Sequence, residues 1–240
     1  MQTAIDLGIL IRTKMFALID CDLIVYRIGF ACETENEKIT IARCAEFVED
    51  LVMKPWVGDY QGFLTGSNNF RKEIAVTAPY KGNRKQPKPK HYDLIRDYLV
   101  KAWGCEVIEG QEADDAIGIK AYEFEDKEDF VIMSIDKDLD MIEGWHYNFV
   151  KDDKYFITEM SAIINFYRQI LTGDTVDNIP GLKGIGPKKA EKILKDCETE
   201  QQLFEAVLKA YDGNIDYLTE QAQLLWIRRK PNEIWQPPLK

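Results

Sequence analysis

Histidine is nearly absent from this chain of 240 residues, since only His91 and His146 occur. Metal sites built on imidazole and catalytic triads are therefore not expected. The five cysteines are widely spaced, and none of them stands in a Cys-x-x-Cys pair. Their pattern favours reduced thiols and argues against a zinc knuckle.

Long apolar runs are also missing. The longest, Met15–Ile19, has five residues, whereas a helix that crosses a bilayer needs about 20. Asp6 lies inside the only apolar patch of the segment Met1–Lys14, so this segment is not expected to be a secretory signal. We therefore expect a soluble, intracellular protein that has no membrane partner.

Positive charge is in the minority, because the net charge is −10. That balance alone argues against nucleic acid as a partner, but the charges are unevenly distributed. Residues 80–101 carry a net charge of +5, and residues 183–195 carry +4. The acidic excess is concentrated elsewhere, in short and dense carboxylate clusters.

The apolar pattern predicts strands and helices in alternation. Short apolar runs typical of buried strands occur at Met15–Ile19, 62–65, 105–108, 130–135 and 147–150. Helical spacing separates them at 41–52 and 92–103, and the second helix is followed by Gly104 as a C-terminal cap. This alternation indicates an α/β fold with a mostly parallel sheet that helices cover. Beyond about Glu159 only helices are predicted, at 160–171, 188–194, 202–211 and 217–229, followed by a loose tail at 231–240.

Carboxylates follow several of the predicted strands. The clusters are Asp20 and Asp22 after the first strand, Glu112, Asp114 and Asp115 after the third, and Asp136, Asp138 and Asp140 after the fourth. The carboxyl ends of parallel strands share one edge of a sheet, so these acids should converge there. Crowded carboxylates need cations, and an all-oxygen ligand set suits Mg²⁺ or Mn²⁺.

Each acidic cluster also has a simpler interpretation. The run Glu112–Asp115 could serve only to cap a helix and complement its dipole. Residues 136–140 begin like a calcium loop, but Met141 and Tyr147 stand where the turn glycine and the last glutamate should be, which rejects an EF-hand. Asp20-Cys-Asp22 also resembles the start of a phosphatase fold with an aspartyl nucleophile, which we keep as a rival.

The glycine-rich segment 178–194 predicts a tight turn that leads into a helix. Pro187 occupies the position of the P-loop lysine, and Lys189 replaces the third glycine of a dinucleotide fingerprint, so both motifs are excluded. A glycine turn before a helix with Pro187 in its first turn aims backbone N–H groups at a phosphate. The alternative is a plain connection between helices with a solvated basic face.

The order of these motifs resembles the 5′-nuclease superfamily of flap endonucleases and 5′→3′ exonucleases. It is most similar to the short phage 5′→3′ exonucleases. The matching segments are Asp20 after a first strand, Phe-Arg-Lys-Glu at 70–73, Tyr-Lys-Gly-Asn-Arg at 80–84, Glu-Ala-Asp-Asp at 112–115, Asp-Lys-Asp at 136–138, Gly-Asp-x-x-Asp-Asn-Ile-Pro-Gly-x-x-Gly-Ile-Gly at 173–186, and a closing Gln-Ala-Gln-Leu-Leu-Trp-Ile-Arg-Arg. An ordered series of this length is far more specific than any single motif.

The resemblance implies a PIN-like nuclease domain at 14–158 and a helix-three-turn-helix region at 159–230 that grips duplex DNA. It implies two divalent ions, Mg²⁺ or Mn²⁺, and a K⁺ ion on the glycine turn. The first ion would be held by Asp20, Glu112, Asp114 and Asp115. The second would be held by Asp136, Asp138, Asp174 and Asp177.

The resemblance also implies roles for basic and glycine residues. Lys81 and Arg84 would act on the scissile phosphate, with Asp20, Asp114 and Asp136 as the central acids of catalysis. The DNA-binding set would be Arg71, Tyr80, Lys81, Arg84, Lys85, Gly181, Gly184, Gly186, Lys188 and Lys189. The implied activity is cleavage of phosphodiester bonds near DNA 5′ ends at flaps, nicks and recessed duplexes, with RNA in RNA–DNA hybrids as a further partner. We expect a monomer in the cytoplasm, which is that of the host cell if the chain is phage-encoded.

Two positions depart from the family pattern. Members usually carry an aspartate after the second strand, and Gly66 stands in that place, so we expect an aspartate introduced there to restore a metal ligand. The segment between Arg84 and Gly104 is short for a full helical arch. Gly66 supports one alternative, a DNA-binding accessory protein with an incomplete metal site. A second alternative is a PIN-type ribonuclease, which would share the acidic cleft but would not require the glycine turn.

Overall fold

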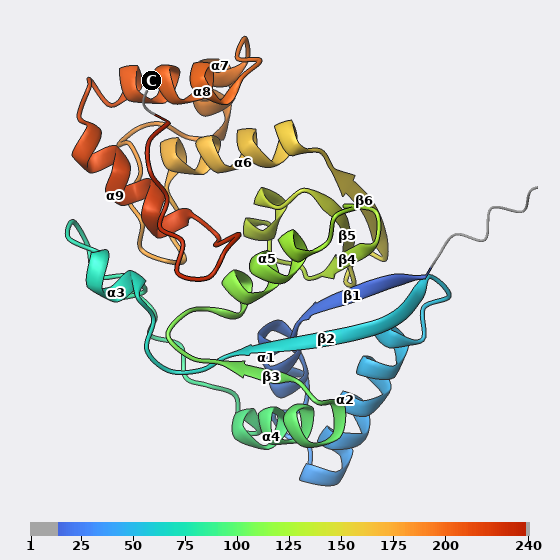
Figure 1. Cartoon of the computed structure of the whole chain (residues 1–240). Helices are drawn as coiled ribbons and strands as arrows, with labels where there is room; N and C mark the ends of the chain where they lie inside the picture. The colour runs from blue at the N-terminus through green and yellow to red at the C-terminus, as the bar shows by residue number, and fades with distance from the viewer. Residues whose placement is uncertain (1–13, 239–240) are drawn as a thin grey trace, which may run out of the picture.

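A six-stranded sheet forms the centre of the chain in this computed structural model, which describes residues 14–238 (Figure 1). The prediction that Met1–Lys14 is no secretory signal falls, except for Lys14, outside the described residues, as do the last two residues of the tail. The strand order is β3-β2-β1-β4-β5-β6. The strands are β1 (Met15–Asp20), β2 (Val57–Thr65), β3 (Glu106–Ile108), β4 (Phe130–Met133), β5 (Gly144–Asn148) and β6 (Asp153–Ile157).

The first five strands are parallel, and only β6 runs antiparallel to its neighbour β5. The predicted α/β fold with a mostly parallel sheet is therefore confirmed. The strand β6 was not predicted, because its Asp-Lys-Tyr-Phe-Ile sequence at the sheet edge has no buried residue. The strand β5 begins three residues earlier than predicted.

Helices cover both faces of this sheet. They are α1 (Cys21–Ala31), α2 (Glu37–Val52), α3 (Arg71–Ile74), α4 (Tyr92–Trp103), α5 (Ala113–Glu123), α6 (Glu159–Thr172), α7 (Pro187–Leu194), α8 (Glu200–Ala210) and α9 (Ile215–Leu225), with a 3-10 turn η1 (Asp138–Met141). The helix α4 ends as predicted, with Gly104 in the left-handed conformation at φ 66°. Within the described residues, no helix is both long and apolar enough to cross a membrane.

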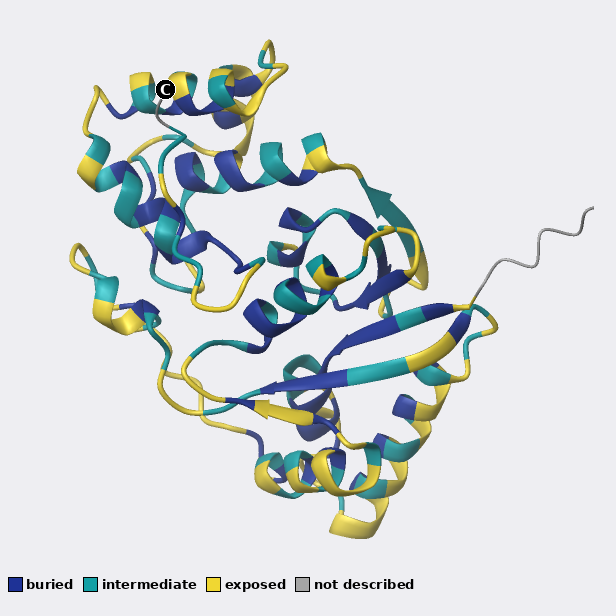
Figure 2. Ribbon diagram, in the orientation of Figure 1, coloured by how far each residue is buried: buried dark blue, intermediate teal, exposed yellow. Residues whose placement is uncertain are grey.

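The central strand β1 is buried on both faces, as its wholly apolar sequence predicts (Figure 2). Ala17 and Ile19 belong to a cluster with α1, α2 and α4. Leu18 points the other way and packs with Ile117 of α5. Alternate residues of one strand therefore hold the helix layers on both sides, and they fix where the strand's last residue, Asp20, emerges.

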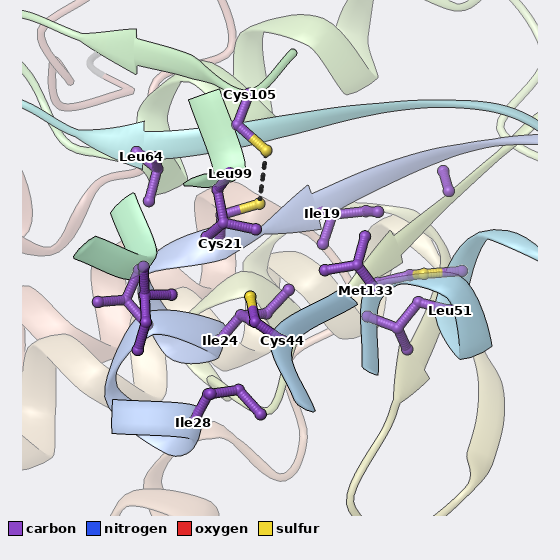
Figure 3. Packing of buried hydrophobic residues seen from close by; sticks show 14 of the residues in the cluster. Ile19, Cys21, Ile24, Ile28, Cys44, Leu51, Leu64, Leu99, Cys105 and Met133 are labelled. Carbon is purple, nitrogen blue, oxygen red and sulfur yellow. Dashed lines mark hydrogen bonds between the residues drawn. The ribbon is translucent and has the colours of Figure 1, made fainter. Parts of the chain in front are cut away.

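Two cysteines meet within the first of these clusters (Figure 3). Their sulfur atoms, Sγ of Cys21 at the start of α1 and Sγ of Cys105 before β3, lie 3.5 Å apart. A side chain at Gly62 of β2 would lie 2.6 Å from each sulfur, so glycine provides the space for the two thiols. All five cysteines are free thiols, and four of them are buried.

The helices α6, α7, α8 and α9 form a separate apolar cluster above the sheet in Figure 1. The helix α9 ends at Leu225, four residues earlier than predicted, and the chain then turns back across it. The predicted loose tail is wrong for the described residues 231–238. Trp235 is 5% exposed and packs on Phe166, and its carbonyl oxygen accepts a hydrogen bond from Gln223.

Candidate metal and nucleic-acid site

Acidic side chains gather at the edge of the sheet where β1, β3 and β4 end. A cleft of about 720 Å³ is lined by Asp20, Glu112, Asp114 and Asp136, among other residues. An adjoining smaller pocket shares Glu112 and Asp114 and adds Asp138, Asp174 and Asp177. The acids that follow separate strands in the sequence therefore converge in space, as the parallel sheet requires.

Backbone geometry holds Asp20 at the base of this cleft. It is the N-cap of α1, and its Oδ1 accepts a hydrogen bond from the N–H of Leu23 at 3.4 Å. Its Oδ2 accepts one from the hydroxyl of Ser134 at 3.0 Å, and the same hydroxyl oxygen accepts the N–H of Asp136. Ser134 thus joins the ends of β1 and β4 and fixes two acids relative to each other.

Five acids of the cleft and of the adjoining pocket lack cationic partners. Among residues 14–238, no ion pair involves Asp20, Asp114, Asp136, Asp138 or Asp174. Burial and the charge of Asp22 raise the pKa of Asp20 to about 7. Burial and repulsion from Asp20 and Asp136 raise the pKa of Asp114 well above its usual range. Burial and the charge of Asp136 raise the pKa of Asp138 to about 7.

These raised pKa values show a cleft that is short of positive charge, and its donors are all carboxylate oxygens. This donor chemistry fits Mg²⁺ or Mn²⁺. Within the described residues, no three Asp, Glu, His or Cys side chains are close enough together to ligate one ion directly. The arrangement fits a hydrated ion, because Mg²⁺ commonly keeps several of its waters when a protein binds it.

The segment 80–84 supplies positive charge to one side of the acids. The Lys81 ammonium contacts Glu112 and lies 3.4 Å from Asp177, and Arg84 contacts Asp177 at 2.7 Å. The hydroxyl of Tyr80 donates to Glu112 and Asp177 at 2.9 and 2.7 Å. Tyr80 is buried, so its placement does not fit the surface DNA contact predicted for it, and it instead orients two acids.

Asp115 and Arg71 differ most from their predicted positions. Asp115 is fully buried, and both of its oxygens accept hydrogen bonds from Arg71 at 2.6 and 2.9 Å. Arg71 is 3% exposed and also donates to the carbonyl oxygens of Leu224 and Trp226. In this structure Asp115 faces the interior instead of the acidic cleft, and Arg71 lies too deep for the DNA contact predicted for it.

Gly66 lies where the family pattern places an acid, directly after β2. A Cβ at this position would lie 2.6 Å from the carbonyl oxygen of Ile108 and would also clash with the carboxylate of Glu109. The Glu109 side chain can move, but a backbone carbonyl cannot move cheaply. The expectation that Gly66→Asp would simply restore a ligand is therefore wrong, because the added side chain has no room.

The glycine turn joins α6 to α7 within the helical region. Gly181 has φ 59° and lies against Gly173, while Gly184 has φ 81° and is exposed. Gly186 caps α7 without a side-chain hydrogen bond, and Lys188 and Lys189 are exposed in the first turn of that helix. The carbonyl oxygens of Gly181 and Gly184 already accept hydrogen bonds from Tyr217 and from the Lys189 ammonium. These contacts compete with the K⁺ ion predicted on this turn.

The segment 75–91 contains turns and extended chain instead of the helices of an arch. Lys85 and Arg84 are exposed in it, and Asn83 donates to the carbonyl oxygen of Thr175 at 2.6 Å. This contact and the N–H of Lys81, which donates to the carbonyl oxygen of Asp177, tie the basic segment to the loop before the glycine turn.

The sequence pattern places Asp22 among the acids after the first strand but gives it no role at the site, and it does not identify two polar residues, Arg96 and Gln169, that contact the acids. Asp22 lines it, and burial raises the pKa of Asp22. Arg96 donates to Asp22 at 3.2 Å, and Gln169 donates to Asp138 at 2.6 Å. The proximity of Asp22 to Asp20 in the sequence was visible. The roles of Arg96 and Gln169 had no sequence signal, because both are single polar residues within amphipathic helices.

The comparisons with known proteins agree with one another. No family model matches the chain. A DNA polymerase I of Rhizobium leguminosarum is 34% identical over 160 residues, which are 60% of this chain and 15% of that protein. A 5′-3′ exonuclease of Bacillus subtilis is 29% identical over 188 residues, which are 70% of this chain and 62% of that protein. The chain thus spans less than two thirds of the length of these relatives.

Two solved structures share the fold. The bacteriophage T5 D15 protein co-crystallised with metal ions has a TM-score of 0.69 at 17% identity, with 88% of this chain and 89% of that chain covered. The T5 D15 flap endonuclease in a complex with DNA and metal ions has a TM-score of 0.59 at 18% identity, with 88% and 98% covered. These similarities agree with the resemblance of the sequence motifs to the 5′-nuclease superfamily. Within the shared fold, the cleft at the sheet edge and the glycine turn lie in two parts of the chain that the basic segment 80–84 connects.

Proposed function

We propose that this chain belongs to the 5′-nuclease superfamily and is a divalent-metal-dependent 5′→3′ exonuclease and flap endonuclease. The observation that carries the proposal is the cleft in which carboxylates without cationic partners face Lys81 and Arg84. A protein that only bound DNA would gain nothing from buried, mutually repelling acids beside a polyanion. The relatives named as 5′-3′ exonucleases and the T5 complex with DNA and metal ions support the same activity.

The acids form two sets, and each set would bind one metal ion. Asp20, Glu112 and Asp114 would hold a first Mg²⁺ or Mn²⁺ ion, and Asp136, Asp138, Asp174 and Asp177 would hold a second. Ions bound there would supply Lewis-acid stabilisation to the entering and leaving oxygens of a phosphodiester. We leave Asp115 out of the first set because Arg71 occupies both of its oxygens.

Residues of the segment 80–85 would orient the acids and neutralise the charge of the DNA phosphates. Tyr80 orients Glu112, the N-cap of α5, and Asp177, which lies in the loop before the glycine turn. Lys81, at the same two acids, would neutralise charge that develops on the scissile phosphate, and the half-exposed Arg84 would reach a neighbouring phosphate. Lys85 would extend this basic surface.

The glycine turn would hold duplex DNA at a distance from the acids. Its N–H groups and the exposed Lys188 at the start of α7 suit a backbone phosphate, which sets register without reading sequence. We leave K⁺ out of the proposal because Tyr217 and Lys189 already donate to the carbonyl oxygens of the turn.

A time course on two 5′-labelled substrates tests the proposal. One is a 5′ flap and the other a 5′-recessed duplex, each with Mg²⁺ or with EDTA, and a matched RNA–DNA hybrid follows as a third. We expect mononucleotides or flap oligomers with Mg²⁺ and no product with EDTA. The variant Asp93→Asn, at an exposed acid of α4, serves as the control and should cleave like the wild type. Cleavage of RNA alone would favour the PIN-type ribonuclease, and tight binding without product would favour the accessory protein.

A further inference from the structure

The end of β2 has no acid of its own, and the geometry there leaves no room for one. Gly66 faces the carbonyl oxygen of Ile108, as described above. The nearest carboxylate, Glu109, is tied to the N–H and hydroxyl of Ser67 and lines a different cavity. If the first metal site has a ligand on this side of the cleft, that ligand comes from another element.

Asp22 in the first turn of α1 reaches this place from across the cleft. Its Oδ2 accepts a hydrogen bond from the N–H of Thr65, the last residue of β2, at 3.0 Å. Its Oδ1 accepts one from Arg96 Nη1 at 3.2 Å, and Nη2 of the same guanidinium donates to the carbonyl oxygen of Thr65 at 2.8 Å. Asp22 and Arg96 together therefore fix the end of β2, because one binds the N–H of Thr65 and the other binds its carbonyl oxygen.

The carboxylate of Asp22 keeps the capacity to bind a cation in this position. An ionised carboxylate offers about four acceptor sites, and the contacts with Arg96 and with the N–H and side chain of Thr65 leave at least one of them for a cation. The side chain lines the same cleft as Asp20, Glu112 and Asp114. The Arg96 guanidinium holds Asp22 in place, because one of its nitrogens donates to Asp22 and the other to the carbonyl oxygen of Thr65. The guanidinium also lies 5.5 Å from the ring centre of Tyr92.

We propose that Asp22 supplies to the first metal site the carboxylate that position 66 lacks, and that Arg96 is its positioning residue. This inference rests on the proposed function, because it concerns the same metal site. It explains how the chain retains an acid at the end of β2 although Gly66 cannot carry one. The carboxylate would lie at the end of β2, as in the family pattern, but it would belong to Asp22 of α1 instead of to a residue of the loop after β2.

Binding of Mn²⁺ to the protein without DNA tests the proposal, by electron paramagnetic resonance and by the rise in Tm on Mn²⁺ addition. Asp22→Asn keeps the size of the side chain and an acceptor for Thr65. We expect it to weaken the tightest Mn²⁺ site about tenfold or more. Glu109→Gln removes the neighbouring carboxylate outside the cleft and should bind Mn²⁺ like the wild type.

Asp114→Asn separates failure of this inference from failure of the proposed function. If Asp114→Asn weakens Mn²⁺ binding and Asp22→Asn does not, Asp22 is only a structural partner of Arg96 and the inference is wrong. If neither variant changes Mn²⁺ binding, the cleft is not a metal site and both proposals fail. Should Asp22→Asn not fold, Asp22→Glu keeps the charge and shifts it by one methylene, and an unchanged Mn²⁺ affinity in that variant would equally overturn the assignment.

Discussion

The helices α5 and α7 both begin at polar, functional-looking segments, yet their first turns have opposite chemistry. The helix α5 begins with Glu112, Asp114 and Asp115, and the N-cap Glu112 and Asp115 form a closed capping box. The helix α7 begins with Gly186, Pro187 and exposed lysines, and no side chain caps it. The acids of α5 thus compensate the positive N-terminal end of that helix dipole. The N–H groups at the N-terminus of α7 remain available to an anion.

This difference suits the two helix starts to different ligands, cations at α5 and phosphate at α7. At α5 the acids exceed what capping needs, so the surplus carboxylates, Asp114 above all, are available for cations. At α7 the backbone N–H groups and lysines are available for phosphate. The proposed activity uses both properties, because cations would bind at the acids of α5 and a backbone phosphate at the start of α7.

The largest effect is expected from Asp114→Asn at the start of α5. Loss of a central ligand should lower the single-turnover rate on a flap with Mg²⁺ by about 10³-fold, within the range seen when a key electrostatic group is removed. The same variant should raise Tm in EDTA, because it removes a buried charge that Asp20 and Asp136 repel. A variant that cleaves at the wild-type rate would remove Asp114 from the site.

Breaking the buried pair behind α5 should mainly cost stability. Arg71→Met leaves Asp115 buried without its partner and should lower the free energy of unfolding by about 3–5 kcal/mol, measured by urea denaturation. Arg43→Met breaks an exposed ion pair with Glu35 and should cost less than about 1 kcal/mol. Equal losses in the two variants would show that the burial of Arg71 is not energetically important.

The open start of α7 should respond in DNA affinity and not in stability. Lys188→Ala should weaken binding to duplexes of any sequence by a similar factor and reduce the salt dependence by about one phosphate contact. Lys101→Ala, at an exposed lysine of α4 that pairs with Asp97, is the matched control. An unchanged salt dependence in Lys188→Ala would favour the alternative interpretation, in which the segment is a plain connection between helices.

In EDTA, the stability of the protein should also depend on pH. The pKa of Asp20 and that of Asp138 are about 7 in the folded protein and near 3.8 in the unfolded chain. The folded state therefore holds more protons between these values, so stability should fall as pH rises from about 4 to about 7 and then level off. Thermal scans should show Tm falling over this interval, and Asp20→Asn should flatten the curve. A Tm that rises with pH would contradict the raised pKa values.

The sequence predicted the features that depend on local pattern. The apolar runs of β1 and β4, the period of α4 with Gly104, and the acids after the strands were all predicted correctly. Features that depend on which way a side chain turns were not. Asp114 and Asp115 are neighbours in the sequence, but successive helix residues point about 100° apart, so one faces the cleft and the other faces Arg71.

Long-range partners account for the remaining differences. Nothing in the Tyr-Lys-Gly-Asn-Arg segment indicates that Tyr80 is buried against Glu112, because that depends on the packing of the loop 173–177. Trp235 was assigned to a loose tail by its proline-rich surroundings, yet an indole can bury a large apolar area and find Phe166. The space at Gly66 depends on Ile108, a residue of another strand.

The contacts of Arg71 have a consequence for the order in which the chain can fold during its synthesis. Arg71 and Asp115 leave the ribosome early, but the carbonyl oxygens of Leu224 and Trp226 that complete their network come more than a hundred residues after Asp115. The N–H of Arg228 also donates to Asp115, and Ile227 packs on the α5 side of the sheet. A nascent chain that ends before residue 224 therefore has an unfinished interior beneath Glu112 and Asp114. The acidic cleft can reach its final form only after the helical region has been made, so we expect the proposed nuclease activity only from chains that extend beyond residue 224.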